Sequence, residues 1–215
     1  SRSMAAENVP YSVSGAKLTY PLKPNMNFSL YLINGWQQIY DINNVPSLAS
    51  QLEIKIGKHH LVNWNVYAGS EQSKFNPNYT NRYFSDIYWI YNSSKKWELS
   101  SCAFIGFQDK FHEKSSHLKN NNYWYQFNIS AKYHVNNSFS FSARVEALDD
   151  VYGNLYGASP FSSGSLSAYG FSLGSNYKLQ NNLIWRTEIR ALDGYFEATP
   201  SSFYLWGLTN LTFWF

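Results

Sequence analysis

Charge, cysteine and long hydrophobic runs are all scarce in this sequence of 215 residues. Charged residues make up 14% of the chain, against about a quarter of an average soluble domain. Because a soluble all-β protein covers its outer surface with charged side chains, this scarcity disfavours one. Cys102 is the single cysteine, so no internal disulfide can form. No run of about 18 apolar residues occurs, so no transmembrane helix is predicted.

Further absences narrow the range of functions. The net charge is +3 and no basic run is longer than two residues, which gives no reason to expect nucleic acid as a partner. The sequence has no glycine-rich phosphate loop, no CxxC and no HExxH motif. The adjacent His59 and His60 point apart and have no third ligand at a defined spacing, so we predict neither a metal site nor a cofactor. No histidine is placed beside an activated serine, so we predict that the protein is not an enzyme.

Aromatic residues, in contrast, are abundant, with 18 Tyr, 15 Phe and 8 Trp. Amphipathic rings gather at both interfaces of a membrane, which is one physical reason to carry so many. The last segment, residues 202–215, alternates two kinds of side chain, and a period of two places them on opposite faces of a strand. One face carries Phe203, Leu205, Gly207, Thr209, Leu211, Phe213 and Phe215, and the other Tyr204, Trp206, Leu208, Asn210, Thr212 and Trp214. Such a strand suits a wall between lipid and a wet lumen.

Eleven segments have strand-like patterns, and short and long connections alternate between them. The predicted strands are 12–22, 27–40, 48–57, 61–71, 82–93, 97–110, 123–135, 138–149, 165–179, 183–196 and 202–215. The short connections are 23–26, 58–60, 94–96, 136–137 and 180–182, and the long ones are 41–47, 72–81, 111–122, 150–164 and 197–201. Short periplasmic turns that alternate with longer extracellular loops are typical of an outer-membrane barrel. The sequence therefore predicts an all-β fold, a transmembrane up-and-down antiparallel β-barrel.

The odd number of strands predicts that residues 1–215 form one barrel domain that is incomplete at its N-terminus. Bacterial single-chain barrels have even strand numbers, because both ends of the chain face the periplasm. We therefore expect the C-terminal eleven strands of a barrel of twelve or more, with residues 1–11 as the end of an extracellular loop. On topology alone, a soluble β-sandwich or jelly roll with hairpins of uneven length stays an alternative.

The distribution of charge within the strands favours the membrane barrel. Arg186, Glu188 and Arg190 share one face of a strand, opposite apolar residues, and Arg144 and Glu146 do the same in another strand. An Arg or Lys on the lipid face costs roughly 2–4 kcal/mol at the middle of the bilayer, which explains the segregation. A soluble barrel would place the apolar set inside and the charges outside.

The strand between these two charged strands predicts a belt of charge in the lumen. Its inward residues are Ala168, Gly170, Ser172, Gly174, Asn176 and Lys178. Because most of them are small, charged side chains from both neighbouring strands have room to approach one another at mid-height of the barrel. The predicted pore-lining residues are Arg144, Glu146, Arg186, Glu188 and Arg190, with Asp86 and Asn128 as further members. The belt either sets the field and width of a pore or neutralises itself and stiffens the wall.

Several motifs together resemble one bacterial family. They are SRSM at 1–4, VPYSVSGAKLTYPL at 9–22, NFSLYLINGW at 27–36, Arg144-x-Glu146 followed by Asp149, Asp150 and Gly153, Trp185-Arg186-x-Glu188-x-Arg190 with Asp193-Gly194, and the terminus LTFWF. In this order, over essentially the whole chain, they resemble the OmpL-like β-barrel porin family (porin-2). The resemblance implies a barrel in the outer membrane of Gram-negative bacteria, in contact with lipid. It also implies insertion by the barrel-assembly machinery, with Phe213 and Phe215 as the C-terminal assembly signal.

Two classes of function follow from these expectations. The first is a channel for passive diffusion of small hydrophilic solutes or ions, whose Arg/Glu belt tunes selectivity. The alternative is a structural or surface-binding barrel that acts through its long loops at 111–122 and 150–164. Its lumen would be plugged by Tyr31, Trp124, Trp206 and Trp214. The strand number of the whole barrel distinguishes them, since about eight strands leave a filled interior and about sixteen an aqueous channel. Whether the protein is a homo-oligomer stays open.

Overall fold

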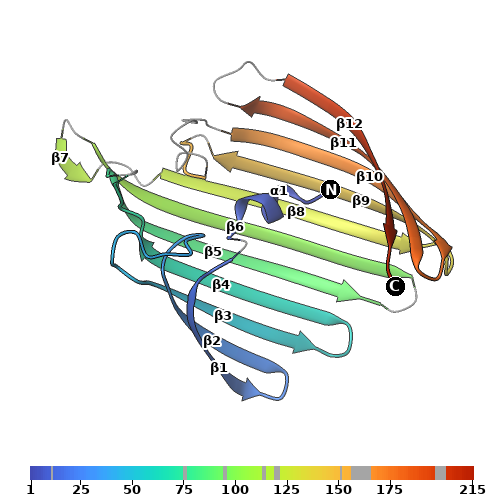
Figure 1. The fold of residues 1–215 in the computed structure, drawn as a ribbon, viewed down its shortest axis with the longest axis horizontal. Helices are drawn as coiled ribbons and strands as arrows, with labels where there is room; N and C mark the ends of the chain where they lie inside the picture. Colours follow the sequence, from blue (N-terminus) through green and yellow to red (C-terminus); the bar gives the residue numbers. More distant parts are fainter. Residues whose placement is uncertain are drawn as a thin grey trace.

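The computed structural model is dominated by one long antiparallel sheet (Figure 1). It describes residues 1–10, 12–74, 77–93, 96–112, 115–118, 122–150, 152–155, 166–196 and 202–215. Eleven strands follow one another in chain order, each hydrogen-bonded to the next. They are β1 (Gly15–Lys23), β2 (Met26–Ile33), β3 (Ser47–Ile56), β4 (His60–Ser70), β5 (Tyr79–Asn92), β6 (Trp97–His112), β8 (Asn122–His134), β9 (Phe139–Asp150), β10 (Leu166–Gln180), β11 (Leu183–Phe196) and β12 (Ser202–Phe213). A short strand, β7 (Ser115–Leu118), pairs with β6 outside this path.

This architecture confirms the predicted all-β antiparallel fold, with three differences. The predicted strand 27–40 is wrong beyond Ile33, where β2 ends. Strand β7 lies inside the predicted connection 111–122, and a five-residue helix, α1 (Met4–Asn8), lies inside the predicted loop end 1–11. Most of the predicted connection 150–164 and all of 197–201 lie outside the described residues.

The sheet is open in the described part of the chain. β1 pairs with β2, and β12 pairs with β11, but β1 and β12 do not pair with each other. The two strands are therefore the margins of the sheet. The expectation of a barrel with twelve or more strands stays a prediction.

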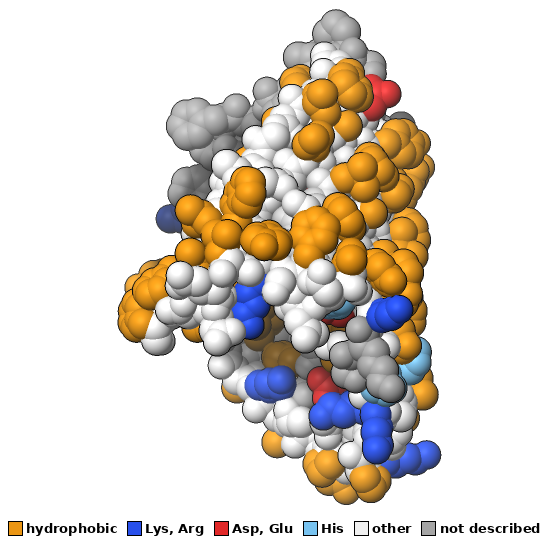
Figure 2. Space-filling model, turned by 90° about the vertical axis from the view of Figure 1, so that its right-hand side faces the viewer, with side chains coloured by type: hydrophobic (Ala, Val, Ile, Leu, Met, Phe, Trp, Pro, Cys, Tyr) orange, Lys and Arg blue, Asp and Glu red, His pale blue; other side chains and the backbone are white. Residues whose placement is uncertain are grey.

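The two faces of the sheet differ as the alternation predicts. In β8, Trp124, Gln126 and Asn128 are buried, whereas Phe127 and Ile129 between and beyond them are 50% and 44% exposed. Hydrophobic side chains cover the exposed face, which we call the outer face; they include Leu18, Leu30, Leu48, Ile105, Phe141, Val145, Phe171, Leu173, Ile189, Leu205 and Leu211. Figure 2, which views the end of the sheet with the short turns, shows Lys and Arg among the turns and hydrophobic side chains along the margin. No helix in the described ranges is long and apolar enough to span a membrane.

The opposite face, which we call the inner face, carries the N-terminal segment. Helix α1 lies across β8 and β9 (Figure 1). The Ser3 hydroxyl caps the helix by accepting a hydrogen bond of 3.2 Å from the Ala6 amide, and the Asn8 side chain donates to the Met4 carbonyl at 2.7 Å. Met4 and Ala5 are buried in the same hydrophobic cluster as Trp124. The segment is thus packed against the sheet.

The stretch after β2 also folds onto the inner face. Gly35 and Gln37 have φ values of +140° and 56°, which break the extended conformation and redirect the chain at Trp36. The Trp36 ring packs edge-to-face on Phe84 at 4.9 Å and on Tyr67 at 5.3 Å between ring centres. The residues predicted to continue the strand therefore cover part of the sheet.

Candidate functional site on the inner face

Four of the predicted belt residues form one ion-pair cluster. Arg144 Nε donates to Glu146 Oε1 at 3.2 Å, and Arg144 Nη2 donates to Glu188 Oε1 at 3.1 Å. Arg190 Nη2 donates to Glu146 Oε1 at 2.5 Å. We call Arg144, Glu146, Glu188 and Arg190 the charged cluster; it links β9 to β11 across β10.

Strand β10 makes this cluster possible because its inner residues are small. Ser172 lies opposite both Arg144 and Arg190 in the sheet, and Gly170 lies opposite Glu146. A Cβ atom added to Gly170 would lie 2.7 Å from Cγ of Glu146, which is closer than real Cβ contacts. The Glu146 side chain therefore occupies the space that a side chain at position 170 would need.

The N-terminal segment supplies further partners to the charged cluster. The Met4 amide donates to Glu146 Oε2 at 2.6 Å, and the Ser1 hydroxyl donates to Glu188 Oε1 at 2.8 Å. Arg144 Nη1 donates to the Ser1 carbonyl at 3.2 Å. Glu146 is 1% exposed, so its negative charge is balanced by two guanidinium groups rather than by water.

The other predicted pore-lining residues lie outside the charged cluster. Arg186 Nη1 donates to the Thr212 hydroxyl at 2.7 Å. Asn128 is next to Glu146 in the pairing of β8 with β9. Asp86 lies on β5, three strands away from β9, and accepts a hydrogen bond from Asn65. Phe213 and Phe215 are both exposed at the end of the chain. The functional roles given to all these residues stay predictions.

A cavity of about 500 Å³ lies beside the charged cluster. Its charged lining residues are Arg144, Arg186 and Glu188, and hydroxyl and amide side chains such as Ser130, Ser142 and Asn210 complete the wall. A polar, charged hollow of this kind suits hydrated solutes.

A second buried charge, which the sequence reasoning missed, lies near the long connections. The Arg82 guanidinium contacts two indole rings, 5.1 Å from the ring centre of Trp36 and 5.2 Å from that of Trp124. Its Nε donates to Gln108 Oε1 at 2.8 Å, and its Nη2 donates to the Asn154 carbonyl at 3.0 Å. The alternation of β5 predicts that Arg82 points inward. It does not predict the partners of Arg82, because they come from loops and from other strands.

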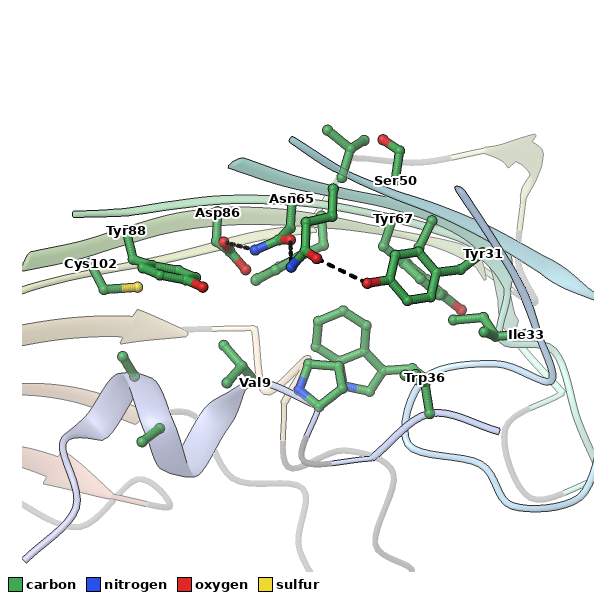
Figure 3. A pocket seen from close by; sticks show the side chains of 18 of the residues that line it. Val9, Tyr31, Ile33, Trp36, Ser50, Asn65, Tyr67, Asp86, Tyr88 and Cys102 are labelled. Atoms are coloured by element: carbon green, nitrogen blue, oxygen red, sulfur yellow. Dashed lines mark hydrogen bonds between the residues drawn. The ribbon is translucent and has the colours of Figure 1, made fainter. Parts of the chain in front are cut away.

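A third feature is a cavity of about 500 Å³ between strands β2–β6 and β8 of the sheet and the N-terminal segment. Its sheet wall includes Tyr31, Gln51, Asn65, Asp86 and Asn128. Figure 3 shows this polar wall on one side and the apolar Val9 and Trp36 on the other. We call this space the inner cavity.

Comparison with known proteins identifies one family and several solved structures, two of which are described here. The family model described as "Putative beta-barrel porin-2, OmpL-like" matches residues 1–210. A crystal structure described as a porin refined at 1.8 Å resolution matches with a TM-score of 0.60 and 12% identity, over 92% of this chain and 60% of that one. The chain thus spans 60% of the length of that porin, and at this identity the likeness concerns the fold alone.

The second solved structure, described as the NanC porin in a rhombohedral crystal form, has a TM-score of 0.42 and 14% identity, over 93% of this chain and 91% of that one. At that TM-score the similarity supports no conclusion about this chain. No curated protein matches the sequence.

Proposed function

Because the chain belongs to the family of OmpL-like β-barrel porins, we propose that it forms the wall of an outer-membrane channel. The channel passes small hydrophilic solutes or ions by passive diffusion, without catalysis. The observation that carries the proposal is the contrast between the two faces. The outer face is hydrophobic and exposed, and the inner face holds buried ion pairs beside a polar cavity.

The charged cluster is the part of the wall that would tune selectivity. Within the cluster two arginines offset two glutamates, so its net charge is near zero. The adjoining cavity is lined by Arg144, Arg186 and Glu188, which leaves one positive charge in excess for a passing ion. We therefore expect a weak preference for anions.

Conductance in planar bilayers tests this function. The full-length gene product should give stable open steps, and the pair of changes Arg144→Glu and Arg190→Glu should move the reversal potential in a salt gradient towards cations. Lys178→Glu is the matched control, because Lys178 is also basic and on β10 of the inner face but lies outside the cluster. A bilayer that stays closed with folded protein contradicts the channel.

A plugged barrel that acts through its extracellular loops is the second candidate. It is favoured by the packing of Arg82 against Trp36 and Trp124, which fills part of the inner face near the long connections. If this plug closes the lumen, Trp36→Ala should raise conductance from near zero. If the lumen is open, the same change should alter conductance only slightly.

Localisation and assembly belong to the same proposal. The hydrophobic outer face suits direct contact with outer-membrane lipid. The exposed aromatic side chains of Phe213 and Phe215 are available to the barrel-assembly machinery. Cell fractionation of the full-length protein tests the location directly.

A further inference from the structure

Three hydrogen bonds along the sheet wall of the inner cavity form a series that runs in one direction. The Tyr31 hydroxyl donates to Gln51 Oε1 at 3.1 Å, and Gln51 Nε2 donates to Asn65 Oδ1 at 3.0 Å. Asn65 Nδ2 then donates to Asp86 Oδ1 at 2.6 Å (Figure 3). Each bond polarises the next, so the series stabilises negative charge on Asp86.

Asp86 is the single formally charged side chain among the described residues that line the inner cavity. None of the ion pairs in the described part of the chain includes it. Two basic side chains of the inner face contact aromatic rings instead: Arg82 lies against Trp36 and Trp124, and the Lys17 ammonium lies 4.9 Å from the centre of the Tyr31 ring. Among the described residues, the inner cavity therefore holds a carboxyl group that no protein cation pairs with, and a cationic ligand would supply the missing positive charge.

Asn128 adds a second acceptor to the same cavity. Its side chain is 92% buried, given a relative exposure of 8%, and it lines the cavity. Within the described residues no donor lies within hydrogen-bond distance of its Oδ1 atom. A buried acceptor without a donor is rare in proteins and points to a partner supplied from outside.

The remaining walls are apolar and aromatic. Trp36, Tyr67 and Phe84 pack edge-to-face at one end, and Ala5 and Val9 face the sheet from the N-terminal segment. Aromatic rings next to a carboxylate are the surroundings that alkylated ammonium groups prefer, since the ring faces attract the charge and the alkyl groups avoid water. An inorganic cation would gain little from such walls.

We propose that the inner cavity binds a small organic cation of the alkylammonium class. Asp86 faces its charge, Asn128 Oδ1 accepts a hydrogen bond from a donor group on it, and the Trp36 end encloses its alkyl groups. The inference rests on the proposed function for the route by which the solute reaches the cavity. A cation held there makes the channel selective for organic amines among small solutes.

Calorimetric titration of choline into the folded full-length protein in detergent micelles tests the site. Its matched ligand is 3,3-dimethyl-1-butanol, which has the same shape without the charge. We expect choline to bind in the millimolar range and the neutral alcohol at least about tenfold more weakly. Asp86→Asn, which keeps the side-chain shape, should weaken choline binding by about tenfold or more.

Glu53→Gln is the control variant. Glu53 is a carboxylate on β3, two residues from Gln51, and it does not line the cavity. The variant should leave choline binding unchanged within about twofold. Equal binding of choline and the alcohol to the unchanged protein, an Asp86→Asn variant that binds choline as tightly as the parent, or no choline binding at all would each overturn the inference.

Titration and conductance separate the two proposals. An open channel that does not bind choline leaves the porin function standing and removes the cation site. A closed barrel that binds choline through Asp86 leaves the cation site standing and removes the porin function.

Discussion

The backbone amide of Met4 donates a 2.6 Å hydrogen bond to the buried carboxylate of Glu146, which attaches helix α1 to the sheet. The other oxygen of the same carboxylate accepts from Arg144 and Arg190. One side chain therefore holds together the N-terminal segment, β9 and β11. Any change at Glu146 acts on packing and on charge at once.

Glu146→Gln should destabilise the protein by about 3 kcal/mol, because an amide leaves the buried Arg190 guanidinium without its counter-charge and Arg144 with Glu188 alone. Urea unfolding in detergent or lipid, followed by the heat-modifiable mobility of the barrel on gels, measures the loss. Glu53→Gln is the matched control: Glu53 is half-buried and accepts one hydrogen bond, of 3.3 Å, from Asn27. Its loss should stay below about 1 kcal/mol. Equal losses for the two variants contradict a special role for Glu146.

Adjacent positions on β8 test which face of the sheet meets lipid. Ile129 is exposed on the outer face, and Ser130 lies on the inner face beside the charged cluster. Ile129→Lys should reduce folding into liposomes by roughly 2–4 kcal/mol, as expected for a Lys on the lipid face near the middle of the bilayer. Ser130→Lys, at nearly the same depth, should cost little. If both variants fold into liposomes equally well, the outer face does not contact lipid.

A methyl group at Gly106 should disturb the packing of Trp124. A Cβ atom added there would lie 2.1 Å from Cζ2 of the Trp124 ring, which has no free space to move into because the residue is fully buried. Gly106→Ala should therefore cost about 1–3 kcal/mol and change the tryptophan fluorescence. The comparison is Gly207→Ala, where the nearest heavy atom is 4.0 Å away. A stable Gly106→Ala variant with unchanged fluorescence would show that the indole does not occupy this position.

The C-terminal residue should matter for assembly in cells more than for stability. The Phe215 side chain is fully exposed and packs only loosely near Phe213, with 6.3 Å between ring centres. Phe215→Ser should leave refolding in detergent unchanged and lower the amount of protein in the outer membrane severalfold. Phe203→Ser, an exposed Phe at the other end of β12, should leave both unchanged. Equal outer-membrane levels for the two variants argue against an assembly signal at the terminus.

The sequence predicts the strands and their faces well, because the underlying pattern is local. Alternation separates Ile129 from Ser130 wherever the strand lies in the sheet. Chain order also places β9, β10 and β11 side by side. As a result, Arg144 on β9 and Glu188 on β11 lie 3.1 Å apart across β10. That these residues set selectivity stays a prediction.

The segments that fold onto the inner face are beyond a local pattern. The sequence predicts that the strand continues through residues 34–40, whereas in the structure β2 ends at Ile33 and positive φ values at Gly35 and Gln37 turn the chain away from the sheet. Helix α1 has five residues, which is too short for a helical period to show. The inner cavity forms where these two segments meet β2–β6 and β8, so no single stretch of sequence contains it.

The margins of the sheet bear on how the chain enters a bilayer. Each of β1 and β12 turns one row of backbone N–H and C=O groups away from its hydrogen-bonded neighbour. In hydrocarbon, an amide without a hydrogen bond costs roughly 2–7 kcal/mol. The summed cost of a row of such amides exceeds the free energy that any one outer-face side chain gains from contact with lipid. We therefore expect burial of the outer face in lipid to be coupled to pairing of both margins with other strands, so that the insertion rate depends on how fast the margins find their partners.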